Sequence, residues 1–145
     1  MIHESKGKNV NEADLAYDTE LRIFFIDVSG RRWDTEAHLN AHFDRLIAAW
    51  KKWSGVKCDM CAGYAGFQFD MTALGSLYRT RGQYVGTHCF DSIVRWGLSD
   101  DPLMRTTQRS IALATHRPSH IYDTKEEAVK VILGLRQGSI TVTAD

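Results

Sequence analysis

The stretch FQFDMTALGSLYRTR, Phe67–Arg81, holds the change from strand to helix that decides the fold. An apolar run ends at Asp70, and a helical pattern starts near Thr72 and runs to about Tyr84. The first turn of a helix has backbone N–H groups without partners, and it favours negative charge. We therefore expect Asp70 or Thr72 to cap this helix.

The same alternation of strand and helix extends in both directions from this stretch. Residues 21–30 predict a strand, which the preceding DLAY segment could pair with as an antiparallel edge. Residues 34–55 predict a helix capped by Asp34 or Thr35. Strands are also expected in residues 56–69, 92–98 and 120–122, a helix after Asp101, and a last helix opening with the Thr124–Glu127 capping box.

This order predicts an α/β fold in a single domain, with a mixed sheet of four to five strands and helices packed mainly on one face. Its 145 residues suit one domain. Residues 1–13 are polar and without period, which predicts a flexible N-terminal arm. Residues 14–137 would form the domain and residues 138–145 a C-terminal tail.

Composition narrows the classes of function. Lys+Arg and Asp+Glu both number 18, and this balance argues against a dedicated nucleic-acid binder. The chain has no apolar run long enough to span a membrane and no signal-peptide pattern, so we expect a cytoplasmic protein with reduced thiols. No phosphate loop is present, and no nucleophile pattern stands out, so neither an enzyme nor a cofactor is expected.

Cys58, Cys61, His88 and Cys89 have the residue types of a zinc site. Cys58 and Cys61 are expected on a strand, however, where residues three apart point to opposite faces. Ordinary buried thiols are therefore the favoured interpretation, and a metal site is the less favoured one.

Thr72 suits phosphorylation as well as capping. A phosphate adds about −1.5 to −2 charge at neutral pH, and a helix N-terminus tolerates that charge. A partner surface matched to the neutral hydroxyl would instead meet repulsion and a desolvation cost. Phosphorylation could then break a complex without unfolding the domain.

The segment Asp70-Met71-Thr72-Ala73-Leu74-Gly75 resembles the Asp-Ser-Ser/Thr-Gly-Leu-Gly turn of STAS domains, a family that includes bacterial anti-sigma-factor antagonists and stressosome proteins. Met71 stands in place of a hydroxyl residue and Ala73 in place of a glycine. The segments 21–47, 92–99 and 120–133 are similar to neighbouring parts of that family in order and spacing, so the resemblance covers about residues 14–136.

The resemblance implies a non-enzymatic regulatory domain that binds a protein partner, such as an anti-sigma factor or a kinase-like protein, and is switched by phosphorylation. Thr72 takes the place of the acceptor, with Ser76 as a second candidate one helical turn on. The partner surface would comprise Asp70, Met71, Thr72, Ala73, Leu74, Gly75 and Leu77.

The alternative function is binding of a small lipophilic molecule or a nucleotide between sheet and helices. We expect that pocket to be lined by Phe67, Phe69, Trp96 and Met104. The oligomeric state is left open by the sequence.

Overall fold

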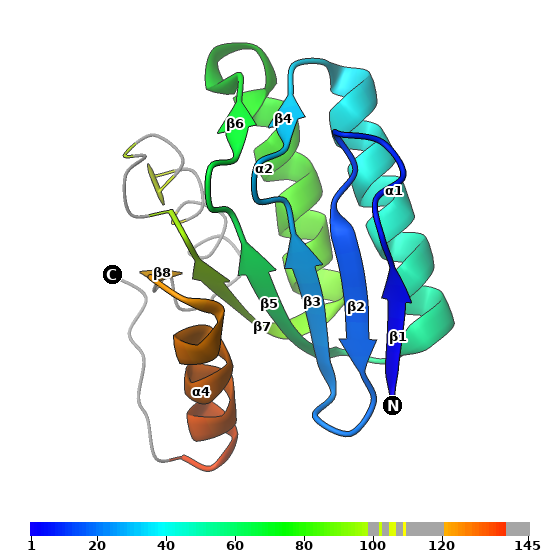
Figure 1. Ribbon diagram of the computed structural model, residues 1–145, viewed down its shortest axis with the longest axis vertical. Coiled ribbons are helices and arrows are strands. Elements are labelled where there is room, and N and C mark those ends of the chain that lie inside the picture. Colours follow the sequence, from blue (N-terminus) through cyan, green and yellow to red (C-terminus); the bar gives the residue numbers. More distant parts are fainter. Residues whose placement is uncertain (99–101, 103–104, 107–108, 110–120, 139–145) are drawn as a thin grey trace.

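A mixed sheet of six strands forms the centre of the computed structural model (Figure 1), which describes residues 1–98, 102, 105–106, 109 and 121–138. The strand order is β1-β2-β3-β5-β7-β8. β1, β2 and β3 pair antiparallel, and β3, β5, β7 and β8 pair parallel. The bounds are β1 Ile2–Ser5, β2 Asp14–Asp18, β3 Ile23–Asp27, β5 Cys58–Gly63, β7 Phe90–Trp96 and β8 Ile121–Tyr122.

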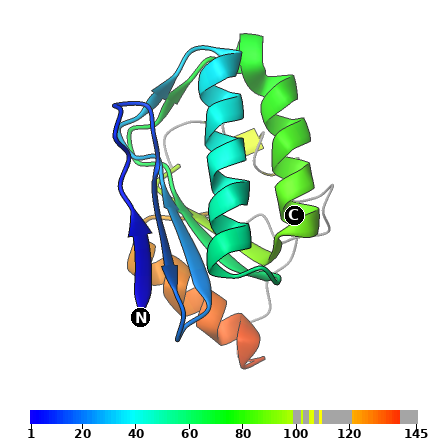
Figure 2. The same cartoon turned by 90° about the vertical axis from the view of Figure 1, so that its right-hand side faces the viewer.

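Helices cover both faces of this sheet. α1 (Glu36–Trp53) and α2 (Met71–His88) lie on one face, over the larger apolar core, and α4 (Lys125–Arg136) lies on the other, over a smaller one (Figures 1 and 2). Right-handed connections between successive parallel strands place α1 and α2 on the same face. α4 follows the last strand, so this rule does not constrain it.

The α/β class and the mixed sheet are thus confirmed, but the predicted number of strands is wrong. The described residues form a sheet of six strands rather than four to five. α1 and α2 share one face, in line with the expectation, and α4 packs on the other. The predicted antiparallel pairing of the DLAY segment is confirmed, since β2 pairs with β3 from Asp14↔Asp27 to Asp18↔Ile23.

The prediction of a flexible arm over residues 1–13 is wrong at Ile2–Ser5, which form the edge strand β1. Arg45 of α1 fastens this strand: its Nη2 donates to the carbonyl oxygen of Ser5 at 3.0 Å and to Ser5 Oγ at 2.8 Å. Backbone pairing and this arginine hold β1 in place, although its side chains are only partly buried.

A second, two-stranded parallel ladder continues the fold beyond the main sheet. β4 (Arg32–Trp33) pairs with β6 (Gln68–Phe69), and each strand leads directly into a helix, α1 or α2. Trp33 is 1% exposed and holds this region together. Its indole N–H donates to Asn11 O at 2.8 Å, and its ring lies 4.8 Å from that of Phe67.

Two of the predicted helix caps are observed, at the starts of α1 and α4. Thr35 accepts a hydrogen bond from the backbone N–H of His38 at 3.2 Å and begins α1. Thr124 accepts from the N–H of Glu127 at 3.2 Å and begins α4. The helix expected after Asp101 falls mostly outside the described residues. Among the helices that the structure describes, none is both long and apolar enough to cross a bilayer.

Candidate functional site

Asp70 occupies the junction between β6 and α2, and it is the cap. Its carboxylate Oδ1 accepts a hydrogen bond from the N–H of Ala73 at 3.2 Å, and its own N–H donates to Trp33 O at 3.4 Å. The turn is thus tied to both β4 and the first turn of α2. Of the two capping residues expected from the sequence, Asp70 performs the role and Thr72 does not.

Thr72 is the second residue of α2 and is exposed. Within the described residues its hydroxyl forms no hydrogen bond. Ser76, one turn further on, is also exposed; its carbonyl oxygen accepts from Thr80 Oγ1 at 3.1 Å, and its hydroxyl forms no hydrogen bond within the described residues. Both candidate acceptors are therefore accessible hydroxyls without a structural role in the described contacts.

The remaining residues of the predicted partner surface divide by burial. Ala73 is exposed, and Met71 and Leu77 are half-buried at the edge of the larger core. Leu74 is only 3% exposed, and Gly75 is buried as well. These two lie on the inner side of α2, so they support the helix and cannot contact a partner.

The exposed face of α2 carries little charge, which sequence analysis missed. The 18-residue helix contains no acidic residue, and its two arginines are Arg79 and Arg81. Arg81 is engaged with α1, donating to Asp44 Oδ1 at 2.7 Å and Asn40 Oδ1 at 3.1 Å. Arg79 is therefore the one full charge among the exposed residues of α2, which are Thr72, Ala73, Ser76, Arg79, Thr80, Tyr84, Thr87 and His88.

The expected ligand pocket is not assembled. Phe67 and Phe69 belong to the larger core, beside Tyr78 of α2 and Trp33. Trp96 lies on the opposite face of the sheet, among the residues packed by α4. Met104 lies outside the described residues. The structure therefore does not bring Phe67, Phe69 and Trp96 to one cavity.

The cysteines and His88 form no metal centre. Cys58 and Cys89 face the larger core and Cys61 the smaller, as their spacing on a strand predicts, while His88 is exposed. Burial raises the pKa of Cys58 to about 11 and that of Cys61 to about 12, so both thiols stay protonated near neutral pH. In the part of the chain that the structure describes, no three potential metal ligands come together.

His42 on α1 is a titratable group that the sequence did not single out. It is partly buried, with its ring 4.4 Å from that of Trp33 and 5.1 Å from that of Phe43. Burial lowers the pKa of His42 from 6.5 to about 3, and the cations of Arg45 and Arg81 act in the same direction. The imidazole is therefore neutral at physiological pH.

Comparison of the chain with protein-family models, with curated proteins and with solved structures found no match. The likeness to STAS domains thus rests on the sequence alone, above all on the segment from Asp70 to Gly75.

Proposed function

We propose that this chain is a non-catalytic regulatory domain of the STAS type, which binds a protein partner through the exposed face of α2 near its N-terminus and is switched by phosphorylation of Thr72. The main support for the proposal is that two residues of the turn between β6 and α2 have different roles. Asp70 caps the helix, while the hydroxyl of Thr72 is exposed and unengaged among the described residues.

The chemistry of α2 supports partner binding at this face. Desolvating charged groups in an interface is costly, and interface centres are depleted in charge. The first two turns of α2 expose Thr72, Ala73 and Ser76, none of them charged. Half-buried Met71 and Leu77 border this patch with apolar surface. Apart from the exposed carboxylate of Asp70, which caps the helix, this patch is uncharged and has an apolar border, so it suits a protein partner better than a nucleic acid.

A phosphate on Thr72 would change this patch without disturbing the core beneath it. The added charge, about −1.5 to −2 at neutral pH, would sit in the first turn of an 18-residue helix, where the helix dipole favours anions. Asp70 already engages the N–H of Ala73 and would repel the phosphate in part. The fold would be retained, while a partner docked on the neutral hydroxyl would be repelled.

The first test is the mass of the protein purified from its own cells. We expect a fraction of the chains to gain the mass of one phosphate, and fragmentation to map it to Thr72 or, less abundantly, to Ser76. Protein that stays unmodified across several growth conditions would refute the phosphorylation switch.

A second test addresses partner binding directly. A photo-crosslinking amino acid at Ala73, which is exposed, should capture one specific protein in those cells. The same amino acid at Lys130, exposed on α4, is the positional control. Thr72→Glu should abolish capture at Ala73, and Thr87→Glu, at the far end of the same helix, should not. Equal capture in the two variants would contradict a switch at Thr72, and no capture at Ala73 would contradict the partner surface.

A further inference from the structure

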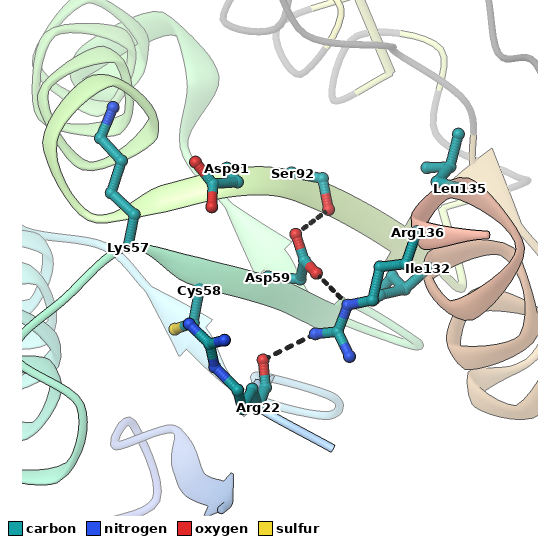
Figure 3. A pocket seen from close by; sticks show the side chains of 9 residues that line it. All are labelled: Arg22, Lys57, Cys58, Asp59, Asp91, Ser92, Ile132, Leu135 and Arg136. Carbon is teal, nitrogen blue, oxygen red and sulfur yellow. Dashed lines mark hydrogen bonds and ion pairs between the residues drawn. The ribbon is translucent and has the colours of Figure 1, made fainter. Parts of the chain in front are cut away.

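A cavity of about 410 Å³ opens at the edge of the sheet where the parallel strands begin (Figure 3). It is lined by the residue before β3, the first residues of β5 and β7 and the last turns of α4. Its volume falls in the range of pockets that hold small molecules. The lining residues are Arg22, Lys57, Cys58, Asp59, Asp91, Ser92, Ile132, Leu135 and Arg136.

One charged pair in this cavity already forms hydrogen bonds within the protein. Asp59 accepts hydrogen bonds from Ser92 Oγ at 2.7 Å and from Arg136 Nε at 2.7 Å. One terminal nitrogen of Arg136 donates to the carbonyl oxygen of Leu21, and the other donates to that of Arg22 at 2.9 Å. Figure 3 draws the contact with Arg22. Asp59 and Arg136 therefore neutralise each other and attach α4 to β5, to β7 and to the two residues before β3.

The backbone of Arg22 is shaped for this arrangement. Arg22 has a φ of 56°, in the left-handed region that residues other than glycine rarely adopt. Successive carbonyls of an extended chain point in opposite directions, whereas a helical residue turns them to the same side. The left-handed conformation of Arg22 thus lets the carbonyl oxygens of Leu21 and Arg22 both accept hydrogen bonds from Arg136. This conformation is unfavourable for an arginine, and it lies in the wall of the cavity.

Three other charged side chains of the lining have no such partners in the part of the chain that the structure describes. Within the described residues, Arg22, Lys57 and Asp91 form no side-chain hydrogen bond or ion pair. The Arg22 side chain lies beside Cys58 in Figure 3, and the raised pKa of that thiol keeps it neutral, so Arg22 has no thiolate counter-charge there. The unpaired groups therefore comprise two cations and one anion.

We propose that this cavity binds a small organic anion, whose phosphate or carboxylate group is held by Arg22 and whose hydroxyl or amino group contacts Lys57 or Asp91, which lie on the other side of the cavity (Figure 3). Arginine presents a planar fork of donors that matches both kinds of anion. The site is separate from the switch at Thr72. It lies beyond the C-terminal end of α2, an 18-residue helix roughly 27 Å long, whereas Thr72 lies at the N-terminal end.

The test is a titration of the full chain followed by the amide signals of its NMR spectrum, with inorganic phosphate and acetate as separate probes. We expect saturable shifts at Arg22, Lys57, Asp59, Asp91 and Ser92, with a dissociation constant in the millimolar range for such minimal probes. Tighter binding of phosphate would identify a phosphorylated ligand, and tighter binding of acetate a carboxylate.

Arg22→Asn is the decisive variant, because asparagine tolerates a left-handed backbone and carries no charge. It should weaken binding of the preferred probe about tenfold, whereas Lys8→Gln, which removes an exposed cation from the loop between β1 and β2, should leave binding unchanged. A thermal melt of each variant confirms that it is folded. The proposal is overturned if neither probe shifts these amides in a saturable way, or if the Arg22→Asn protein, still folded, binds as tightly as the parent.

Methylammonium serves as the probe of opposite charge. It should shift these amides more weakly than either anion. Stronger saturable binding of methylammonium at Asp91 would show that the cavity selects cations, and it would overturn the proposal as well.

Discussion

The neutral imidazole of His42 predicts a loss of stability in mild acid that one substitution should remove. The pKa of His42 is lowered from 6.5 to about 3 in the folded state. Well above pH 6.5 the imidazole is neutral in both states and contributes nothing. As the pH falls below 6.5 the unfolded chain takes up a proton that the folded chain does not, so the free energy of unfolding decreases until the pH reaches the folded-state pKa.

The magnitude follows from the size of this window. Well below pH 6.5 each pH unit costs about 1.4 kcal/mol. Because the unfolded histidine is already half protonated at pH 6.5, the free energy of unfolding should fall by about 2.3 kcal/mol between pH 6.5 and pH 4.5 on account of His42 alone. This is an upper bound, because His42 is only partly buried. It is still a large fraction of the 5–15 kcal/mol, roughly, that stabilises a typical domain.

Urea unfolding at a series of pH values measures the effect. In His42→Asn the difference between pH 7 and pH 4.5 should shrink by about 2 to 3 kcal/mol relative to the parent. Loss of the packing contacts of the imidazole should lower the free energy of unfolding by the same amount at pH 7 and at pH 4.5. His88→Asn, which removes an exposed histidine of α2, should retain the pH dependence of the parent. The same pH dependence in His42→Asn and the parent would refute the reasoning, as would an NMR titration in which the His42 ring takes up its proton near pH 6.5.

Three further predictions follow from other contacts. Asp70→Ala should lower the free energy of unfolding by about 1 kcal/mol through loss of the helix cap, whereas Thr72→Ala should change it by less than about 0.5 kcal/mol. Urea unfolding measures both variants, and equal losses would contradict the assignment of the cap to Asp70. Gly63→Ala should destabilise the domain by about 2 kcal/mol or more, because the added methyl group would lie 2.1 Å from Trp96 Cζ2, and a melting temperature like that of the parent would contradict this close approach. The three thiols, all buried, should react with a thiol reagent only after denaturation, and rapid labelling of the native protein at pH 7 would contradict their burial.

The local signals in the sequence were sufficient for elements with a strong period or a marked start. Thr35, Asp70 and Thr124 cap the helices where the residue types indicated, because a capping side chain acts on the backbone within three residues of itself. The opposite orientation of Cys58 and Cys61 likewise followed from the two-residue period of a strand.

Features set by distant contacts were not predictable in this way. β1 has the sequence IHES, which carries no apolar alternation, and it is a strand because β2 and Arg45 pair with its backbone. β4 and β6 have two residues each, too few for any period. The apolar pattern of α4 shows which side of the helix is buried but not which face of the sheet it covers.

The candidate site was predicted in part for the same reason. The position of Thr72 beside a capping Asp70 could be inferred locally. The burial of Leu74 and Gly75 depends on how α2 packs on the sheet. The cavity of Arg22, Asp59 and Arg136 joins residues up to 114 positions apart, and no local pattern indicates such a meeting.

The late position of α4 in the chain has a consequence for synthesis on the ribosome. α4 buries Ile23, Cys61 and Val94 on its face of the sheet, yet about 40 residues separate Trp96 from Arg136. At translation rates of about 5–20 residues per second, roughly 2 to 8 seconds would pass between the synthesis of Trp96, at the end of β7, and that of Arg136, at the end of α4. A nascent chain released before Lys125 would keep this apolar face open to other nascent chains and to chaperones.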